Sequence, residues 1–156
     1  AAHDRLVRLP VPDGLHTLLV HPDLVVETRV ARERLRAPYA IGDFVPQSEA
    51  LALFLAGLYT NDHALIRAGL KDVLVEPRRA DLIPGFAAIK QAMLDHDAYG
   101  ASISGAGPSV FGWFASRAAA EAAQVDALGA FAHAGLEARA YVSPVASAGA
   151  RIESCT

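Results

Sequence analysis

A glycine-rich turn holds the residues with the clearest potential for chemistry. Residues 104–109 read Ser-Gly-Ala-Gly-Pro-Ser and lie between two apolar, strand-like segments. The two glycines permit backbone conformations that a Cβ would block, and they let another backbone or a phosphate group approach closely. Pro108 fixes the φ angle at the end of the turn. From these residues alone, the turn is either a phosphate-facing loop or a glycine-rich hairpin without a ligand.

Arginines upstream of this turn provide groups that could hold a carboxylate, because a planar guanidinium donates two parallel hydrogen bonds. Arg79 follows Pro77 at an expected helix break, from which its side chain can be aimed into a cleft. Arg32 comes four residues after Thr28, so the two share one helix face. Thr28 can also cap this helix. Glu76 can pair with a neighbouring arginine or lie near a substrate amine.

The sequence carries no metal signature and no nucleotide signature of its own. It has no Gly-x-x-x-x-Gly-Lys-[Ser/Thr] string, and its two lysines, Lys71 and Lys90, lie outside any such context. The six histidines show no ligand spacing, and no zinc signature is present. We therefore expect no metal ligand and no catalytic residue in this chain.

Composition predicts one globular domain. The chain has 156 residues, of which 53% are hydrophobic and 20% are charged. The net charge of −3 argues against nucleic acid or an anionic membrane as the main partner. The single cysteine, Cys155, rules out an internal disulfide framework and favours the cytoplasm. No apolar run approaches the roughly 20 residues that span a bilayer. A start at Ala1-Ala2-His3 without methionine predicts the C-terminal half of a longer protein.

Hydrophobic periodicity predicts the elements that position these groups. We expect strands at 6–9, 15–20, 99–103, 109–114, 136–143 and 150–153. We expect helices at 28–35, at 47–59 as a buried helix, at 61–74 with a cap at Asn61-Asp62, after Gly85 to about 94, and at 116–133 with Ser116 as N-cap. This order predicts an α+β fold with helices packed on one face of a mainly antiparallel sheet.

Four segments carry a family resemblance. Residues 100–112 resemble the third signature motif of the GHMP kinases, Ser-Gly-x-Gly-Pro-[Ser/Thr]-x-Phe. Residues 76–86 are similar to the homoserine kinase pattern Glu-Pro-x-Arg-x-x-Leu-[Ile/Leu]-Pro-Gly-[Phe/Tyr], and residues 28–32 and 148–152 resemble two further elements of that family. Because the four follow family order over residues 28–152, the chain resembles the C-terminal half of a homoserine kinase.

The resemblance implies a fold and an activity. The fold is a ferredoxin-like GHMP kinase C-terminal domain at 26–156, with residues 1–25 as the end of the N-terminal domain and linking strands. The activity is ATP-dependent phosphorylation of the L-homoserine hydroxyl to O-phospho-L-homoserine in threonine biosynthesis. ATP and Mg²⁺ would be bound mainly by the N-terminal half, so the isolated chain is expected to be inactive. The implied partners are L-homoserine, that N-terminal half and a second copy in a homodimer.

The resemblance also implies roles for particular residues. Arg79, Thr28 and Arg32 would bind the substrate, and a phosphate-facing set would support the phosphate loop: Ser104, Gly105, Ala106 and Gly107. Some relatives carry histidines in the helix aligned with residues 45–59, where this chain has none; Gln47 or Ser48 could hydrogen-bond instead.

Two alternatives stay open. One is another GHMP kinase, acting on a mevalonate or isoprenoid alcohol. The other is a non-catalytic amino-acid-binding or dimerisation module, in which residues 47–59 and 82–94 form an exposed apolar face.

Overall fold

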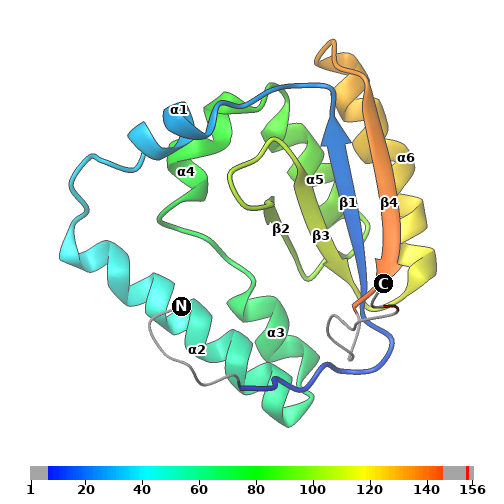
Figure 1. Ribbon diagram of the computed structural model, residues 1–156. Helices are drawn as coiled ribbons and strands as arrows, with labels where there is room; N and C mark the ends of the chain where they lie inside the picture. Colours follow the sequence, from blue (N-terminus) through cyan, green and yellow to red (C-terminus); the bar gives the residue numbers. More distant parts are fainter. Residues whose placement is uncertain (1–6, 146–153, 155–156) are drawn as a thin grey trace.

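The fold is built on a four-stranded antiparallel sheet. A computed structural model describes residues 7–145 and residue 154. The strands are β1 (His16–Pro22), β2 (Gly100–Ile103), β3 (Val110–Phe114) and β4 (Ala138–Pro144), in the spatial order β2-β3-β1-β4 (Figure 1). The predicted α+β class is confirmed, and the strands predicted at 15–20, 99–103, 109–114 and 136–143 are all present within one or two residues.

β1 occupies the middle of the sheet. It pairs with β3 on one side and with β4 on the other, so that Leu18 faces both Gly112 and Val142. The predicted domain boundary after residue 25 groups β1 with the linking strands, but β1 is hydrogen-bonded into the same sheet as the later strands. The assignment of residues 1–25 to the end of an N-terminal domain and its linking strands stays a prediction.

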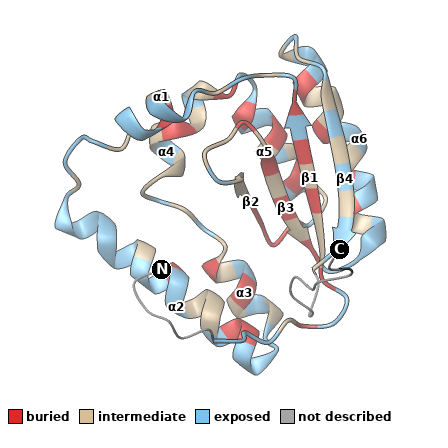
Figure 2. Cartoon of the chain, viewed as in Figure 1, coloured by how far each residue is buried: buried red, intermediate tan, exposed pale blue. Residues whose placement is uncertain are grey.

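Two helices cover one face of the sheet. They are α5 (Phe86–Asp95) and α6 (Arg117–His133), and both pack on the strand residues that point to this side (Figure 2). The Ser116 side chain accepts a hydrogen bond from the Ala119 N–H at 3.2 Å, so the predicted N-cap is confirmed. Buried alanines spaced by three or four residues let α6 lie close to the sheet. The largest fully buried side chains of the main core include those of Leu18, Ile89, Met93, Phe114 and Phe131.

A helix pair contacts the opposite face. It consists of α2 (Ile41–Thr60) and α3 (His63–Gly69), and a Cβ at Gly69 would overlap the backbone of Phe54, which shows how closely the two helices cross. The Phe54 ring lies 5.6 Å from the Trp113 ring of β3. Since Trp113 alternates with the core residues Gly112 and Phe114, α2 and α3 approach the second face. The prediction that the helices pack on one face of the sheet therefore holds for α5 and α6, whereas α2 and α3 contact the other face.

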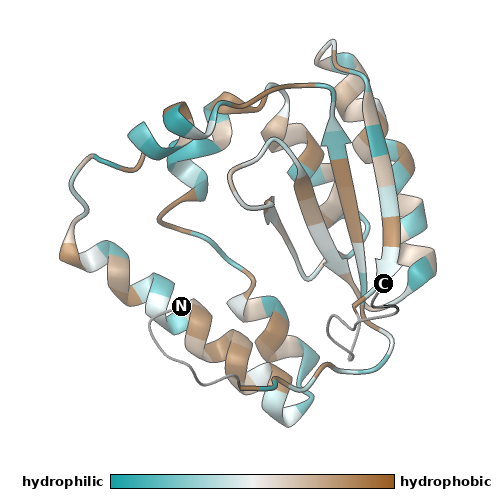
Figure 3. Cartoon of the chain, in the orientation of Figure 1, coloured by the Kyte–Doolittle hydropathy of each residue, from teal (hydrophilic) through white to brown (hydrophobic). Residues whose placement is uncertain are grey.

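The helix predicted at 47–59 is longer and less buried than expected. It begins at Ile41, where the Asp43 carboxylate accepts a hydrogen bond from the Ala40 N–H at 3.2 Å. Ile41 is 84% exposed and Val45 is 67% exposed, so these two apolar residues of α2 reach solvent. Figure 3 shows the hydrophobic colour along much of α2. In contrast, four of the six large apolar residues of 82–94 are buried, namely Ile83, Phe86, Ile89 and Met93, so the exposed apolar face predicted for that segment does not form.

Three short elements join these layers. They are α1 (Thr28–Glu33), α4 (Glu76–Arg79) and a 3-10 turn, η1 (Ala80–Leu82). α1 ends before the predicted Leu35, and its N-cap is Glu27, so the prediction of Thr28 as a cap is wrong. Pro77 lies in the first turn of α4 and does not end a helix, because proline suits a first turn, whose N–H groups lack partners within the helix.

Other boundaries also differ from prediction. α3 ends at Gly69 instead of continuing to 74, and Asp72 Oδ1 accepts the N–H groups of Leu74 and Val75 at 3.0 and 2.7 Å, which stabilises an irregular segment. Residues 7–10 are irregular, so the strand predicted at 6–9 is absent there. The strand predicted at 150–153, the motif at 148–152 and Cys155 lie outside the described residues.

Candidate functional site

The glycine turn connects β2 to β3 and is closed by its own hydrogen bonds. The Ser104 N–H donates to the Ser109 carbonyl at 2.8 Å, and the Gly107 N–H donates to the Ser104 carbonyl at 3.0 Å. Gly105 and Gly107 have φ angles of +61° and +84°, a region that side chains with a Cβ disfavour. The two glycines are therefore required by the shape of the turn, whatever lies in front of it.

Arg79 stabilises this turn by a hydrogen bond from its side chain. Its side chain is buried, with 8% exposure. Nε donates to the Ala31 carbonyl of α1 at 3.1 Å, and Nη1 donates to the Gly105 carbonyl at 3.2 Å. One guanidinium thus joins α1, α4 and the glycine turn. These two bonds use two of the five N–H groups that an arginine carries, so the Nη1–Nη2 edge keeps donors for a further acceptor.

The structure brings the other predicted substrate residues into the same neighbourhood through α1. Thr28 and Arg32 both have exposed side chains on α1. Ala31, directly before Arg32, is buried and supplies the carbonyl that Arg79 contacts. The predicted trio therefore shares one region, with Arg79 inside it and the α1 pair at its surface. Among the described residues, Arg79 forms no hydrogen bond with the Thr28 or Arg32 side chain.

Neighbouring arginines have structural partners. Arg34 forms an ion pair with Asp81 at 2.8 Å, which ties the end of α1 to η1. Arg78 donates to the carbonyls of Ala37 and Pro38, both at 2.8 Å, and its guanidinium lies 3.6 Å from the centre of the Tyr39 ring. These contacts hold the segment after α1 against α4, so the site rests on a supported frame.

Glu76 pairs with a residue that the sequence reading did not connect to it. Its Oε1 accepts a hydrogen bond from Lys90 Nζ of α5 at 2.5 Å, and Oε2 is buried without a hydrogen-bond partner among the described residues. Glu76 therefore forms a salt bridge at a helix end, but its partner is Lys90 and not the predicted arginine. Only the packing of α4 on α5 reveals Lys90, because 14 residues separate the two partners.

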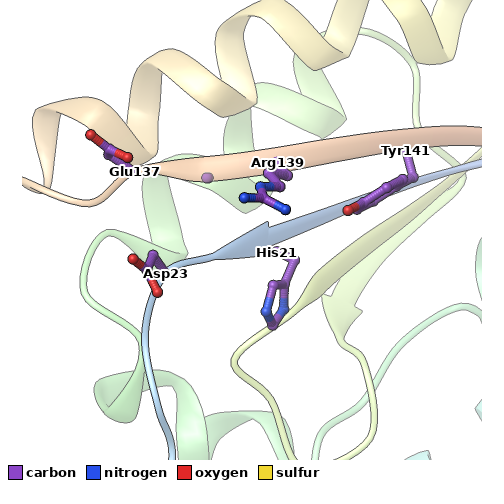
Figure 4. Close-up of a pocket in the computed structure, with 6 residues that line it drawn as sticks. His21, Asp23, Glu137, Arg139 and Tyr141 are labelled. Carbon is purple, nitrogen blue, oxygen red and sulfur yellow. The ribbon is translucent and has the colours of Figure 1, made fainter.

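His21 is a second neighbour of the turn that sequence reasoning missed. Its Nδ1 lies 2.8 Å from the Ser109 Oγ. His21 also lines an open cavity of about 450 Å³ together with Asp23, Arg139 and Tyr141. Figure 4 shows these polar side chains along β1 and β4, with Arg139 and Tyr141 on β4 and His21 on β1. The turn is thus contacted from β1 on one side and from α4 on the other.

A separate polar cluster joins α3 to the start of β2. His63 Nδ1 lies 2.5 Å from the Tyr99 hydroxyl, and the Arg67 guanidinium lies 4.8 Å from the centre of the Tyr99 ring. Burial raises the pKa of the Tyr99 phenol, and the nearby Arg67 charge partly opposes that rise. We interpret the cluster as structural, since it packs beside the small core of Leu15, Leu58 and Ile66.

No group of three or more His, Cys, Asp or Glu side chains in residues 7–145 and 154 could hold a metal ion. No helix in that part of the chain is long and apolar enough to cross a membrane.

Comparisons with known proteins point in one direction. A family model described as "GHMP kinases C terminal" matches residues 54–133. Proteins named homoserine kinase from Xylella fastidiosa (strain M12) and Xanthomonas campestris pv. campestris (strain B100) are each 58% identical to this chain over 149 residues, covering 96% of it and 46% of themselves. The chain therefore spans about half the length of the curated relatives it matches.

Solved structures agree on the fold. The crystal structure of homoserine kinase from Cytophaga hutchinsonii has a TM-score of 0.86 and 40% identity, covering 89% of this chain and 44% of that one. Streptococcus pneumoniae phosphomevalonate kinase, in complex with phosphomevalonate and AMPPNP, has a TM-score of 0.60 and 15% identity, covering 86% of this chain and 41% of that one. The second likeness is one of fold alone.

Proposed function

Because this chain belongs to the family of GHMP kinase C-terminal domains, we propose that it is the C-terminal half of a homoserine kinase. The whole enzyme would transfer the γ-phosphate of ATP to the hydroxyl of L-homoserine, and the product would be O-phospho-L-homoserine, in threonine biosynthesis. The observation that carries the proposal is the 58% identity to proteins named homoserine kinase over nearly the whole chain.

The geometry of Arg79 supports a role in holding the acceptor. A carboxylate is best held by two parallel hydrogen bonds from one guanidinium, and the Nη1–Nη2 edge of Arg79 retains donors after its bonds to Ala31 and Gly105. Those bonds fix the plane of the guanidinium before any substrate arrives. Such preorganisation lowers the entropic cost of binding. Thr28 and Arg32 are proposed as further substrate contacts from the exposed side of α1.

The glycine turn is proposed to support the phosphate-binding loop of the other half. Its backbone is exposed at Gly105, and its curvature is set by two left-handed glycines. Phosphoryl transfer depends mainly on positioning and on stabilisation of charge. The contribution of this half would therefore be to hold the acceptor and the turn in a fixed relation, with Ser104 to Gly107 facing the transferred group.

ATP and Mg²⁺ are assigned to the other half of the enzyme. The described residues form no group of acidic side chains or histidines that fits a metal ion, and the sequence has no phosphate-loop string. We further propose that the N-terminal half is its stable partner, that the enzyme forms a homodimer, and that it acts in the cytoplasm.

A chimera tests the activity directly. Residues 1–156 would replace the matched segment of the Xanthomonas campestris homoserine kinase, and homoserine-dependent ADP release would be measured. We expect activity from the chimera and none from this chain alone. Arg79→Lys in the chimera should raise the KM for homoserine about tenfold, which corresponds to roughly 1.4 kcal/mol, while the KM for ATP stays within about twofold.

Arg117→Lys is the matched control, because Arg117 is exposed on α6 and forms an ion pair with Glu121 there. A folded chimera that phosphorylates mevalonate-type alcohols but not homoserine would show that homoserine is not the acceptor. Unchanged homoserine kinetics in Arg79→Lys would remove Arg79 from the substrate site.

A further inference from the structure

A cavity between α2 and the outer edge of β2 takes no part in the chemistry described so far. Its volume is about 220 Å³. The walls come from the side of α2 that carries Leu51, from the segment after α3 and from residues 101–103 of β2. We propose that this cavity binds a small L-α-amino acid with an aliphatic side chain. The inference goes beyond the proposed kinase function and does not rest on it.

The main chain of β2 supplies the first half of the recognition. β2 is an edge strand, paired only with β3 in the described sheet. The Ser104 N–H donates to Ser109, and hydrogen-bonded positions alternate along an antiparallel pair. Ala101 and Ile103 therefore direct their N–H and C=O groups away from β3, at the unpaired edge of β2, and both residues line the cavity.

A free amino acid carries the same two groups as one residue of a neighbouring strand. Its ammonium can donate to a carbonyl of β2, and its carboxylate can accept from an N–H of β2. This is the pattern by which an extended segment adds to a sheet edge. An L-amino acid satisfies it with its side chain on a defined side, and this predicts discrimination against the D form.

Polar side chains at the cavity supply one charge of each sign. Lys71 brings an exposed ammonium, and Asp72 brings a carboxylate whose Oδ1 is used by two backbone N–H groups, which leaves Oδ2 as an acceptor. Gln47 accepts a hydrogen bond from the Val73 N–H through Oε1 at 2.9 Å, so its amide nitrogen remains as a donor. The set is neutral overall and fits a zwitterion better than a simple anion or cation.

The remaining wall is apolar and limits size. Its side chains belong to Leu51, Phe54, Leu70, Ile103 and Phe111. A volume of 220 Å³ corresponds to about seven water molecules at roughly 30 Å³ each, which suits a ligand of about that number of non-hydrogen atoms. Norvaline is of this size. A hydroxylated chain such as that of homoserine would place a polar group against the apolar wall, so homoserine should bind more weakly than norvaline.

The chain contains its own reporter for this site. Trp113 is the single tryptophan, and its ring lies 5.6 Å from that of Phe54, which lines the cavity. L-norvaline would be titrated into the chain while Trp113 fluorescence and the amide NMR shifts of Ala101 and Ile103 are followed. We expect a saturable change with a Kd of about 1 mM or lower, and D-norvaline should bind about tenfold more weakly.

A pair of variants makes the test specific. Leu51→Glu places a charge in the apolar wall and should raise the Kd for L-norvaline about tenfold. Val125→Glu makes the same change at an exposed apolar residue of α6, far from the cavity lining, and should leave the Kd within about twofold. Both residues are solvent-exposed on helices, so both variants should fold.

Three results would overturn the inference. They are the absence of any saturable change, equal binding by Leu51→Glu and the parent chain, or tighter binding of L-homoserine than of L-norvaline at this cavity. The assay needs neither ATP nor the other half of the enzyme. Homoserine-dependent ADP release by the chimera carrying Leu51→Glu, expected to stay within about twofold of its parent, would show separately whether the kinase proposal stands.

Discussion

Replacement of Arg79 by glutamine tests whether one side chain supports the whole site. Arg79 is buried and makes two charge-assisted hydrogen bonds, of 3.1 Å to Ala31 and 3.2 Å to Gly105. Such bonds contribute about 1.5–3 kcal/mol each, and lengths above 3.0 Å place these two at the lower end. Glutamine is too short to reach both carbonyls. We therefore expect Arg79→Gln to lower the free energy of unfolding by about 3 kcal/mol.

Urea unfolding followed by Trp113 fluorescence measures this difference. For a chain of this size the loss corresponds to a fall in Tm of roughly 6–12 °C. Hydrogen exchange adds a local readout, because the Gly107 N–H that closes the turn should exchange faster in the variant. Arg117→Gln, which removes only an exposed ion pair with Glu121, should cost less than about 0.5 kcal/mol. If Arg79→Gln matched Arg117→Gln in stability and exchange, Arg79 would not support the turn.

Three further predictions follow from other contacts. Gly107→Ala should destabilise the chain more than Gly105→Ala, by about 1 kcal/mol in urea unfolding. Both glycines have positive φ, but a Cβ at 107 meets two isoleucine side chains at 3.2 and 3.3 Å, whereas a Cβ at 105 meets nothing within 4 Å. Equal losses of stability in the two variants would contradict this reasoning. Lys90→Met should lower the free energy of unfolding by about 1–2 kcal/mol at neutral pH, because it leaves the buried Glu76 carboxylate unpaired. The expected loss is small for a buried pair because Lys90 is 29% exposed. An unchanged urea midpoint would contradict this prediction. Because burial raises the pKa of Tyr99, its phenol stabilises the fold fully below the ordinary tyrosine pKa of about 10, and this contribution is lost as the pH rises through the higher folded value; Tyr99→Phe should remove the highest-pH step of the tyrosinate absorbance titration, and persistence of that step would contradict the assignment.

The parts of the fold that local signals control could be read from the sequence. Residues 99–114 alternate around a Gly-x-Gly-Pro turn, and the observed strands fall within one residue of the predicted ends. Ser116 followed by an alanine-rich run predicted α6 because both the cap and the helix propensity are local properties. In each case the interactions that decide the structure connect residues close together in sequence.

Long-range contacts decided the rest. Arg79 lies 48 residues from Ala31 and 26 from Gly105, so no local pattern reveals its partners. The predicted length of α3 failed for a similar reason. A Cβ at Gly100 would overlap Leu70, which shows that β2 passes directly over the end of that helix. The chain continues as the Asp72 turn instead of a further helical turn.

The position of β1 shows the same limit. Its residues have the alternation of a strand, but alternation does not distinguish a central strand from an edge strand. Thr17 lies opposite Trp113 in β3 and opposite Ser143 in β4, and both partners come far later in the chain. Local sequence patterns therefore do not show where β1 lies. Only its pairing with β3 and β4 places it in the middle of the sheet.

The arrangement around Arg79 couples the two parts of the proposed site. The guanidinium that would bind the acceptor carboxylate also donates to the Gly105 carbonyl of the turn. A displacement of the turn therefore changes the orientation of the donors that face the acceptor, even though no glycine has a side chain to touch it. His21 contacts the same turn through Ser109 at its other end, which limits that displacement. On the proposed function, the acceptor and the phosphate-facing turn are thus held in register by hydrogen bonds within this half, before the nucleotide-binding half takes part.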